Sequence, residues 1–169
     1  MGTLRLTLLR HGHAEPIDAA PEDYVRQLTV RGRSEATAMG ERLARAGRIP
    51  ELILVSSAAR TRTTAQLAAA ALGLPATHIA PLDGLYNAEA PRIWELVRSE
   101  AGKAQHVLVC GHNPGLSRLA SELAAGSGTL PRRIDLPPAG LVSAVWPAHR
   151  AGWPDLALAD ARDAELILP

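Results

Sequence analysis

LRLTLLRHGHAEP, residues 4–16, joins an apolar run to an end rich in charge and imidazole. Residues 4–9 are typical of a strand that is covered on both faces, because such strands are nearly continuous in hydrophobic character. The run then ends on Arg10, His11 and Gly12. Charged and imidazole side chains are seldom buried without partners, so the rest of the chain has to supply a reason for this ending.

Two further apolar runs, ELILVS at residues 51–56 and QHVLVC at 105–110, have the same character. Thr29 is placed to cap a helix, and Pro114 suits a first helical turn. The helical patterns cover residues 28–47, 59–73, 90–102 and 114–126. Strands that alternate with helices predict an α/β fold of three layers, with a mostly parallel central sheet flanked by helices.

The last part of the chain differs in composition. A loop rich in Gly and Pro covers residues 126–140, and short apolar segments follow it at 141–147, 155–160 and 164–169. We expect these segments to be short additional C-terminal strands, antiparallel, at one edge of the sheet. The length of 169 residues suits a single domain over residues 1–169.

Charge and composition exclude several classes of function. The net charge of +1 gives no strong field toward nucleic acid or anionic membranes. No apolar run is long enough to span a bilayer, and the first residues lack a signal-peptide pattern. The single cysteine, Cys110, cannot form an internal disulfide, and we interpret it as part of the core. We therefore expect a cytoplasmic protein with no nucleic-acid or membrane partner.

Polar residues follow each of the three strong strands. In open α/β sheets the carboxyl ends of the strands meet at one edge, and ligands bind in the crevice beyond them. Two arginines, two histidines and two helix N-termini should therefore meet there. The residues concerned are Arg10, His11 and Gly12 after the first strand, Ser56, Ser57 and Arg60 after the second, and Gly111, His112 and Asn113 after the third.

This combination suits phosphate chemistry. Arginine offers a planar fork of donors that matches phosphate oxygens, and helix N-termini add oriented backbone N–H groups. Gly12, which lacks a Cβ, would let the backbone approach a ligand closely. A neutral histidine can attack phosphorus and form a covalent intermediate, while the surrounding positive groups stabilise charge on the transferring phosphoryl group.

At this point the sequence resembles a known family. LRHGHAE (9–15), LTVRGRSEA (28–36), LILVSSAARTRTTAQ (52–66) and VLVCGHNPGLSRLA (107–120) resemble, in order, the segments of the histidine phosphatase superfamily, the phosphoglycerate mutase-like proteins. The short chain and LYNAEAPRIWELV (85–97) look like the small SixA-type phosphohistidine phosphatases. Four segments in order are far more specific than one Arg-His-Gly motif.

The resemblance implies a phosphoglycerate mutase-like fold and a role for each matching residue. His11 would be the phospho-accepting nucleophile, Arg10 and Arg60 would hold the phosphoryl group, and His112 would hydrogen-bond it. Ser57 and Asn113 would be neighbours of the pocket, together with Gly12. The resemblance implies no metal and no organic cofactor. The expected partner is a phosphorylated protein carrying phosphohistidine, or a small phosphorylated substrate, with phosphate or another oxyanion held in the pocket.

The chain departs from the family pattern at two points. Ser57-Ala58 stands where many relatives have Ser-Pro, and the glutamate motif that supplies a general acid in larger relatives is absent. Asp83 and Glu89, which flank GLYNA, are the available candidates for an acid. Imidazole is a far better leaving group than an alkoxide, so we hypothesise that phosphohistidine needs less help from such an acid.

Three other interpretations remain open at this level. The chain could be a small-molecule phosphomonoesterase of the same superfamily, acid-phosphatase-like in activity. It could be a non-catalytic module that uses the same pocket to bind phosphate on a phosphorylated partner. His11 and His13 form a His-x-His pair that could bind metal, but no further cluster of ligands with suitable spacing follows it. His13 is more simply interpreted as a residue of the pocket rim.

Overall fold

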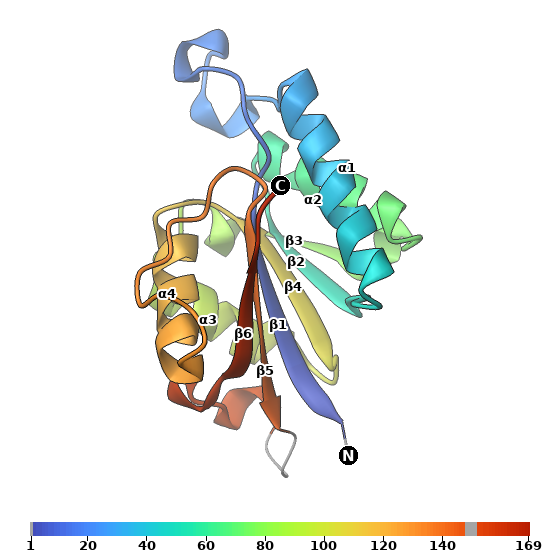
Figure 1. The fold of residues 1–169 in the computed structure, drawn as a ribbon. Helices are drawn as coiled ribbons and strands as arrows, with labels where there is room; N and C mark the ends of the chain where they lie inside the picture. Colours follow the sequence, from blue (N-terminus) through green and yellow to red (C-terminus); the bar gives the residue numbers. More distant parts are fainter. Residues whose placement is uncertain (1, 148–151) are drawn as a thin grey trace.

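The computed structural model describes residues 2–147 and 152–169 of the 169. Six strands form one sheet in the order β3-β2-β4-β1-β5-β6 (Figure 1). The strands are β1 (Thr3–Arg10), β2 (Leu52–Ser56), β3 (Ile79–Leu82), β4 (His106–Gly111), β5 (Leu141–Pro147) and β6 (Arg162–Ile167). Strands β1 to β4 are mutually parallel, and β5 runs antiparallel to both of its neighbours, β1 and β6. The predicted mostly parallel sheet is therefore confirmed.

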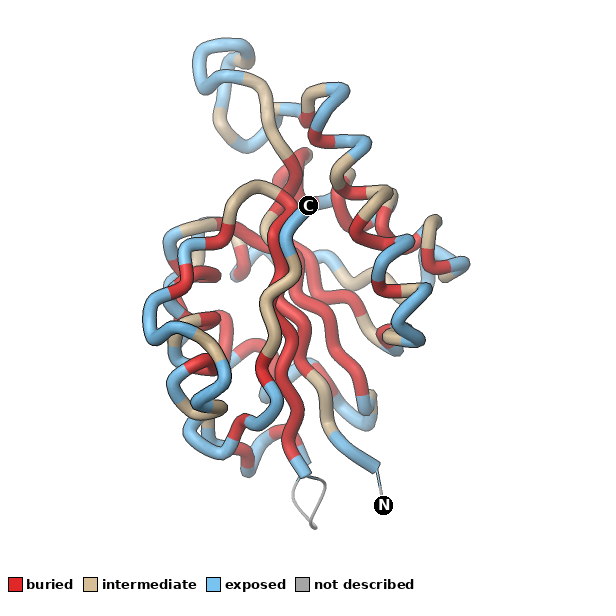
Figure 2. Tube along the Cα trace, in the orientation of Figure 1, coloured by how far each residue is buried: buried red, intermediate tan, exposed pale blue. Residues whose placement is uncertain are grey.

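Four helices cover the sheet and make this an α/β domain of three layers (Figure 1). Helices α1 (Val30–Arg45) and α2 (Ala59–Ala71) pack on one face, and α3 (Ala90–Glu100) and α4 (Gly115–Ser127) pack on the other. Each face has its own apolar cluster against the sheet. Every residue of β4 is buried, as Figure 2 shows for the central strands, because helices lie on both sides of it.

Local sequence signals account for the start of the first helix. The Thr29 side chain accepts a hydrogen bond from the Gly32 backbone N–H at 3.1 Å, so the predicted N-cap of α1 is confirmed. Pro114 stands one residue before α4, at its N-cap position, rather than inside the first turn. Helices α2 and α4 begin three and four residues after the ends of β2 and β4, which places both N-termini at the carboxyl edge of the sheet.

The sequence-based prediction of strands was wrong in two places. Residues 155–160 form no strand; the short 3-10 helices η5 (Trp153–Asp155) and η6 (Leu158–Asp160) occupy this region, and η6 packs against α4. Pro154 has no N–H to give to a sheet, which favours the turn. Strand β3 was not predicted, because it has four residues and contains Pro81. It pairs only with β2, and an edge strand tolerates proline.

Residues 11–29, which connect β1 to α1, are called here the β1–α1 segment. They contain two 3-10 helices, η1 (Ile17–Ala19) and η2 (Asp23–Val25), and project beyond the carboxyl ends of the strands, at the top of Figure 1. The segment pairs with itself through one bridge between Ala14 and Leu28. It therefore lies where the sequence analysis expects a ligand to bind.

Candidate active site

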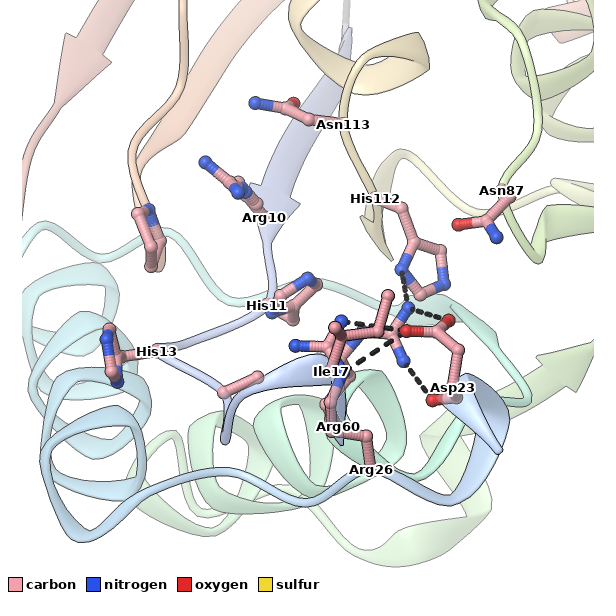
Figure 3. Close-up of a pocket in the computed structure, with 12 residues that line it drawn as sticks. Arg10, His11, His13, Ile17, Asp23, Arg26, Arg60, Asn87, His112 and Asn113 are labelled. Atoms are coloured by element: carbon pink, nitrogen blue, oxygen red, sulfur yellow. Dashed lines mark hydrogen bonds and ion pairs between the residues drawn. The ribbon is translucent and has the colours of Figure 1, made fainter. Parts of the chain in front are cut away.

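A cavity of about 450 Å³ opens at the carboxyl edge of the sheet, beside the N-termini of α2 and α4 (Figure 3). Helix N-termini present unpaired backbone N–H groups and favour anions. Most of the lining is polar or charged. The lining residues are Arg10, His11, His13, Ala14, Ile17, Asp23, Arg26, Arg60, Asn87, His112, Asn113 and Pro138. The structure thus brings four sequence-predicted residues, Arg10, His11, Arg60 and His112, to one cavity.

His11 follows β1 directly, and its backbone is fixed by a hydrogen bond from its N–H to the Gly111 carbonyl at 3.2 Å. Its Nδ1 lies 2.8 Å from the Gly12 carbonyl oxygen. A carbonyl can only accept, so Nδ1 carries the proton and Nε2 keeps its lone pair. Burial, with the nearby charges of Arg60 and Arg10, outweighs this hydrogen bond and lowers the pKa of His11 to about 4. His11 is therefore a neutral imidazole with a free Nε2 at pH 7.

Arg60 and His112 are hydrogen-bonded to each other. Arg60 Nη2 lies 3.2 Å from His112 Nδ1, and because a guanidinium can only donate, Nδ1 is the acceptor. The proton of His112 therefore sits on Nε2, which lies 2.7 Å from Ser56 Oγ. Burial and the charge of Arg60 lower the pKa of His112 to about 3. The rings of His11 and His112 meet edge to face, with centroids 5.5 Å apart.

Asp23 is a site residue that the sequence analysis missed. Its carboxylate accepts hydrogen bonds from Arg60 Nη2 at 2.9 Å and from Arg26 Nε and Nη2 at 3.1 and 2.8 Å (Figure 3). It also accepts one from Tyr86 Oη at 2.7 Å. Partial burial acts to raise the pKa of Asp23, but the hydrogen bonds from Tyr86 and Arg26 and the charge of Arg60 outweigh it. The pKa of Asp23 is therefore held well below its usual range, and the group is ionised.

The charged residues of the cavity favour a doubly charged anion. Arg10, Arg26 and Arg60 together with Asp23 carry a net formal charge of +2. Within residues 2–147 and 152–169, Nε of Arg10 and Nε of Arg60 are buried with no hydrogen-bond partner. Buried donors normally find partners, so two unpaired guanidinium N–H groups beside one cavity indicate that an external acceptor completes them. A phosphoryl group, with up to two negative charges and three acceptor oxygens, matches this arrangement.

Of two other sequence-predicted residues, Asn113 is held by contacts within the protein, whereas the buried Oγ of Ser57 has no hydrogen-bond partner among the described residues. Asn113 lines the cavity, but its Nδ2 donates to the Leu136 carbonyl at 3.0 Å and its Oδ1 accepts from Ser117 Oγ at 2.7 Å. The Ser57 side chain is buried, and it does not line the cavity. In this structure, the Asn113 amide therefore connects the start of α4 to the loop that follows the helix.

The structure gives a different reason for Gly12 from the one expected. Gly12 does not line the cavity, and a Cβ built on it would lie 2.4 Å from the Gly32 carbonyl oxygen, at the start of α1. Gly32 meets the same restriction, because its own Cβ would lie 2.0 Å from the His13 carbonyl oxygen. The absence of a side chain at position 12 therefore allows close packing of the β1–α1 segment against α1.

The two candidate general acids lie outside the cavity lining. Asp83 is exposed in the 3-10 helix η4 (Asp83–Leu85), and exposed Glu89 pairs with Arg118 at 2.5 Å. Their loop instead contributes Asn87, which lines the cavity with a left-handed backbone φ of 49°. His13 lies at the rim as expected, with Nδ1 2.9 Å from Thr29 Oγ1.

Two further properties concern metals and membranes. Among the described residues, no three His, Cys, Asp or Glu side chains converge closely enough to hold a metal ion. No helix in the described ranges has both the length and the apolar character needed to cross a bilayer. Cys110 is fully buried in β4, where burial raises the pKa of its thiol, so it has no reactive thiolate.

Comparisons with known proteins relate the chain to one family and fold. Residues 6–89 match the family model described as histidine phosphatase superfamily (branch 1). The chain is 31% identical to the candidate phosphohistidine phosphatase SixA of Nakamurella multipartitia, with a TM-score of 0.72 over 99% of this chain and 95% of that one. It is 30% identical to the candidate phosphohistidine phosphatase SixA of Agrobacterium tumefaciens, with a TM-score of 0.70 over 83% of this chain and 91% of that one.

The chain covers only part of the length of one longer relative. An uncharacterized chloroplastic protein of Arabidopsis thaliana is 31% identical over 141 residues, which cover 73% of this chain and 60% of the plant protein. The shared region is therefore about three fifths of that relative.

Proposed function

Because the chain belongs to the histidine phosphatase superfamily, we propose that it hydrolyses protein phosphohistidine through a covalent phospho-His11 intermediate. One observation carries the proposal: a neutral His11 with a free Nε2 shares a cavity with two guanidinium groups, Arg10 and Arg60, whose Nε–H groups have no partner among the described residues. This arrangement supports the proposal, because the attacking atom and the donors for its phosphoryl target would share one cavity before substrate binds.

The proposed reaction has two displacements at phosphorus. His11 Nε2 attacks the phosphoryl group while the bond from phosphorus to the substrate imidazole breaks. The substrate ring, protonated from solvent on its other nitrogen, leaves as neutral imidazole. Water then attacks phospho-His11, the bond from phosphorus to Nε2 breaks, and inorganic phosphate departs. Arg10 and Arg60 would stabilise the negative oxygens in both steps, and the backbone hydrogen bond at Nδ1 keeps His11 in the tautomer that can attack.

The choice of phosphohistidine over a phosphate ester rests on the state of the one carboxylate that lines the cavity. Asp23 is ionised and both of its oxygens are occupied, so it has no proton to give to a departing alkoxide. A departing imidazole is much less basic, with a conjugate-acid pKa of about 6.5, and needs less assistance. This supports a phosphohistidine substrate for the site.

The test is to trap the phosphoenzyme. Wild-type protein incubated with a phosphohistidine-bearing protein and quenched in base should carry a base-stable, acid-labile phosphoryl label. His11→Ala should lose the label and lower turnover by at least about 10³-fold, because it removes the attacking atom. His78→Ala, one residue before β3 and outside the cavity lining, is the matched control and should keep both the label and the turnover.

A panel of phosphorylated metabolites assayed beside the phosphohistidine protein completes the test. Higher kcat/KM for any metabolite would make the chain a small-molecule phosphatase. Phosphate binding with no turnover of any substrate would make it a non-catalytic phosphate-binding module. Turnover and labelling that survive in His11→Ala would contradict the proposed intermediate.

A further inference from the structure

Asp23 connects the β1–α1 segment to the catalytic edge of the sheet. One carboxylate oxygen, Oδ2, accepts from Arg60 Nη2 and Tyr86 Oη, and the other, Oδ1, accepts twice from Arg26. The main-chain carbonyl of Asp23 accepts a fifth bond, from Arg60 Nη1 at 2.7 Å. Arg26 in turn donates to the Glu15 carbonyl at 2.8 Å. The carboxylate is thus the centre of a network drawn from three separate parts of the chain.

The network fixes the orientation of Arg60. Its side chain is 3% exposed, and both terminal nitrogens donate to Asp23, one to the main chain and one to the carboxylate. Nη2 makes a second donation, to His112 Nδ1. The guanidinium plane is therefore set before any substrate arrives, and Nε is the nitrogen left without a partner among the described residues. Donors fixed in advance stabilise a transition state without the cost of reorganisation.

We propose that Asp23 is a positioning residue that acts through Arg60, fixing the guanidinium for phosphoryl transfer. The inference rests on the proposed function. Asp23 does not serve as a proton donor in this role, because both of its oxygens already accept hydrogen bonds from cationic or hydroxyl donors. The segment that carries Asp23 has no regular periodicity, so its contribution is visible only in the three-dimensional contacts.

The position of the carboxylate has an electrostatic consequence that separates this role from simple folding. Asp23 brings one negative charge to a cavity that would receive a phosphoryl dianion, so it weakens the general attraction for phosphate. Its contribution is alignment of Arg60, not charge. Removing the charge while keeping the shape should therefore lower kcat and leave ground-state binding of phosphate as tight as before, or tighter.

The experiment compares Asp23→Asn with Asp18→Asn. The amide at position 23 can accept on one side only, so donors on the other side lose their partner. We expect kcat on the phosphohistidine protein to fall about 10²-fold, the scale of losses caused by small misplacements of catalytic groups. The Kd for inorganic phosphate, measured by calorimetry, should stay equal or fall a few-fold. Asp18→Asn makes the same chemical change in η1, at an exposed residue outside the cavity lining, and should match wild type.

Tyr86→Phe provides an intermediate variant. It removes one of the two hydrogen bonds to Oδ2 and leaves the bond from Arg60 in place, so kcat should fall less than in Asp23→Asn. Unchanged kcat in Asp23→Asn would overturn the positioning role. Phosphate binding that weakens tenfold or more, together with a lowered Tm, would also overturn it, because this pattern reports collapse of the segment. A wild type without any turnover would instead overturn the phosphatase itself, a result that is distinct from both.

Discussion

Strands β1 and β4 carry an arginine and a histidine at each end, and the two ends differ in whether these side chains find partners. At the amino end Arg5 lies opposite His106 in the parallel register. At the carboxyl end Arg10 lies opposite Gly111, and His112 follows at once. The same two strands thus present similar residue types at both ends of the sheet.

The amino end is a closed network. Arg5 Nη1 donates to Ser143 Oγ at 3.0 Å, Ser143 Oγ lies 3.1 Å from Thr7 Oγ1, and Thr7 Oγ1 lies 2.9 Å from His106 Nε2. Glu165 lies 3.8 Å from Arg5 and also pairs with Arg48, so the two guanidinium groups share one carboxylate. Thr7 and Ser143 are fully buried and His106 nearly so, and none of the four has a buried side-chain nitrogen or oxygen left unpaired within the described ranges.

The carboxyl end keeps unused hydrogen-bonding capacity beside a cavity. Nε of Arg10 and Nε of Arg60 have no partner among the described residues, and His11 Nε2 has a free lone pair. Buried arginine and histidine therefore do not by themselves mark a functional site. Unpaired donors and an imidazole nitrogen with a free lone pair around an open cavity mark it, since a structural network satisfies its members and a binding site leaves them for the ligand.

The test with the largest expected effect on kcat/KM replaces one arginine at each end by lysine. Lysine keeps the charge but lacks the planar fork, so Arg60→Lys should lower kcat/KM on the phosphohistidine protein by about 10²- to 10³-fold. Arg5→Lys should change kcat/KM by less than about twofold, because the amino end takes no part in the reaction. Equal losses in the two variants would show that both ends serve the site and would contradict the contrast.

The strong strands and the residues at their ends could be predicted from sequence because both depend on local order. Once parallel strands are assigned, topology alone brings their carboxyl ends together, and Arg10, His11, Arg60 and His112 follow. The sequence analysis failed where the signal was weak. Strand β3 has four residues with a proline, and residues 155–160 contain a short apolar run yet form 3-10 turns.

Asp23 and Arg26 could not be found for a different reason. Asp23 begins the three-residue 3-10 helix η2 and Arg26 follows it, where no hydrophobic period exists. The partners of Asp23, Arg60 and Tyr86, are 37 and 63 residues away along the chain. An Asp-x-x-Arg spacing is common on any surface, so the local sequence carries no signal of this network. Gly12 shows the same limit, since its role depends on the distant Gly32.

An effect of medium size is expected on the stability of the protein at acid pH, through the buried histidines at both ends of the two strands. Burial, aided by the charge of Arg5, lowers the pKa of His106 to about 4, as burial does for His11 and His112. The unfolded chain, with a histidine pKa of about 6.5, binds more protons between those values, so stability rises with pH in this window. The stabilisation that comes from keeping these histidines neutral is fully present above about pH 6.5 and is lost progressively toward pH 4.

Urea unfolding at a series of pH values separates the two ends. By linkage, each such histidine should lower the free energy of unfolding by about 2 kcal/mol at pH 5 relative to pH 7. His106→Gln should remove its share of the slope between pH 6.5 and 4 and keep kcat/KM at pH 7. His112→Gln should flatten the slope in a similar way and lose activity. A slope that His106→Gln leaves unaltered would mean that His106 is not held neutral by the fold.

The smallest effect comes from the hydroxyl at the centre of the amino-end network. Thr7→Val is close to isosteric but removes the group between His106 Nε2 and Ser143 Oγ, leaving two buried polar atoms with one partner fewer. We expect a loss of about 1–2 kcal/mol in the free energy of unfolding, measured in urea at pH 7, with kcat/KM unchanged. Stability and activity should separate in this variant because the network lies at the opposite end of β1 from His11. A fall in kcat/KM beyond about twofold would show that the amino end also controls the position of His11, and the two ends would then have to be treated as one coupled system.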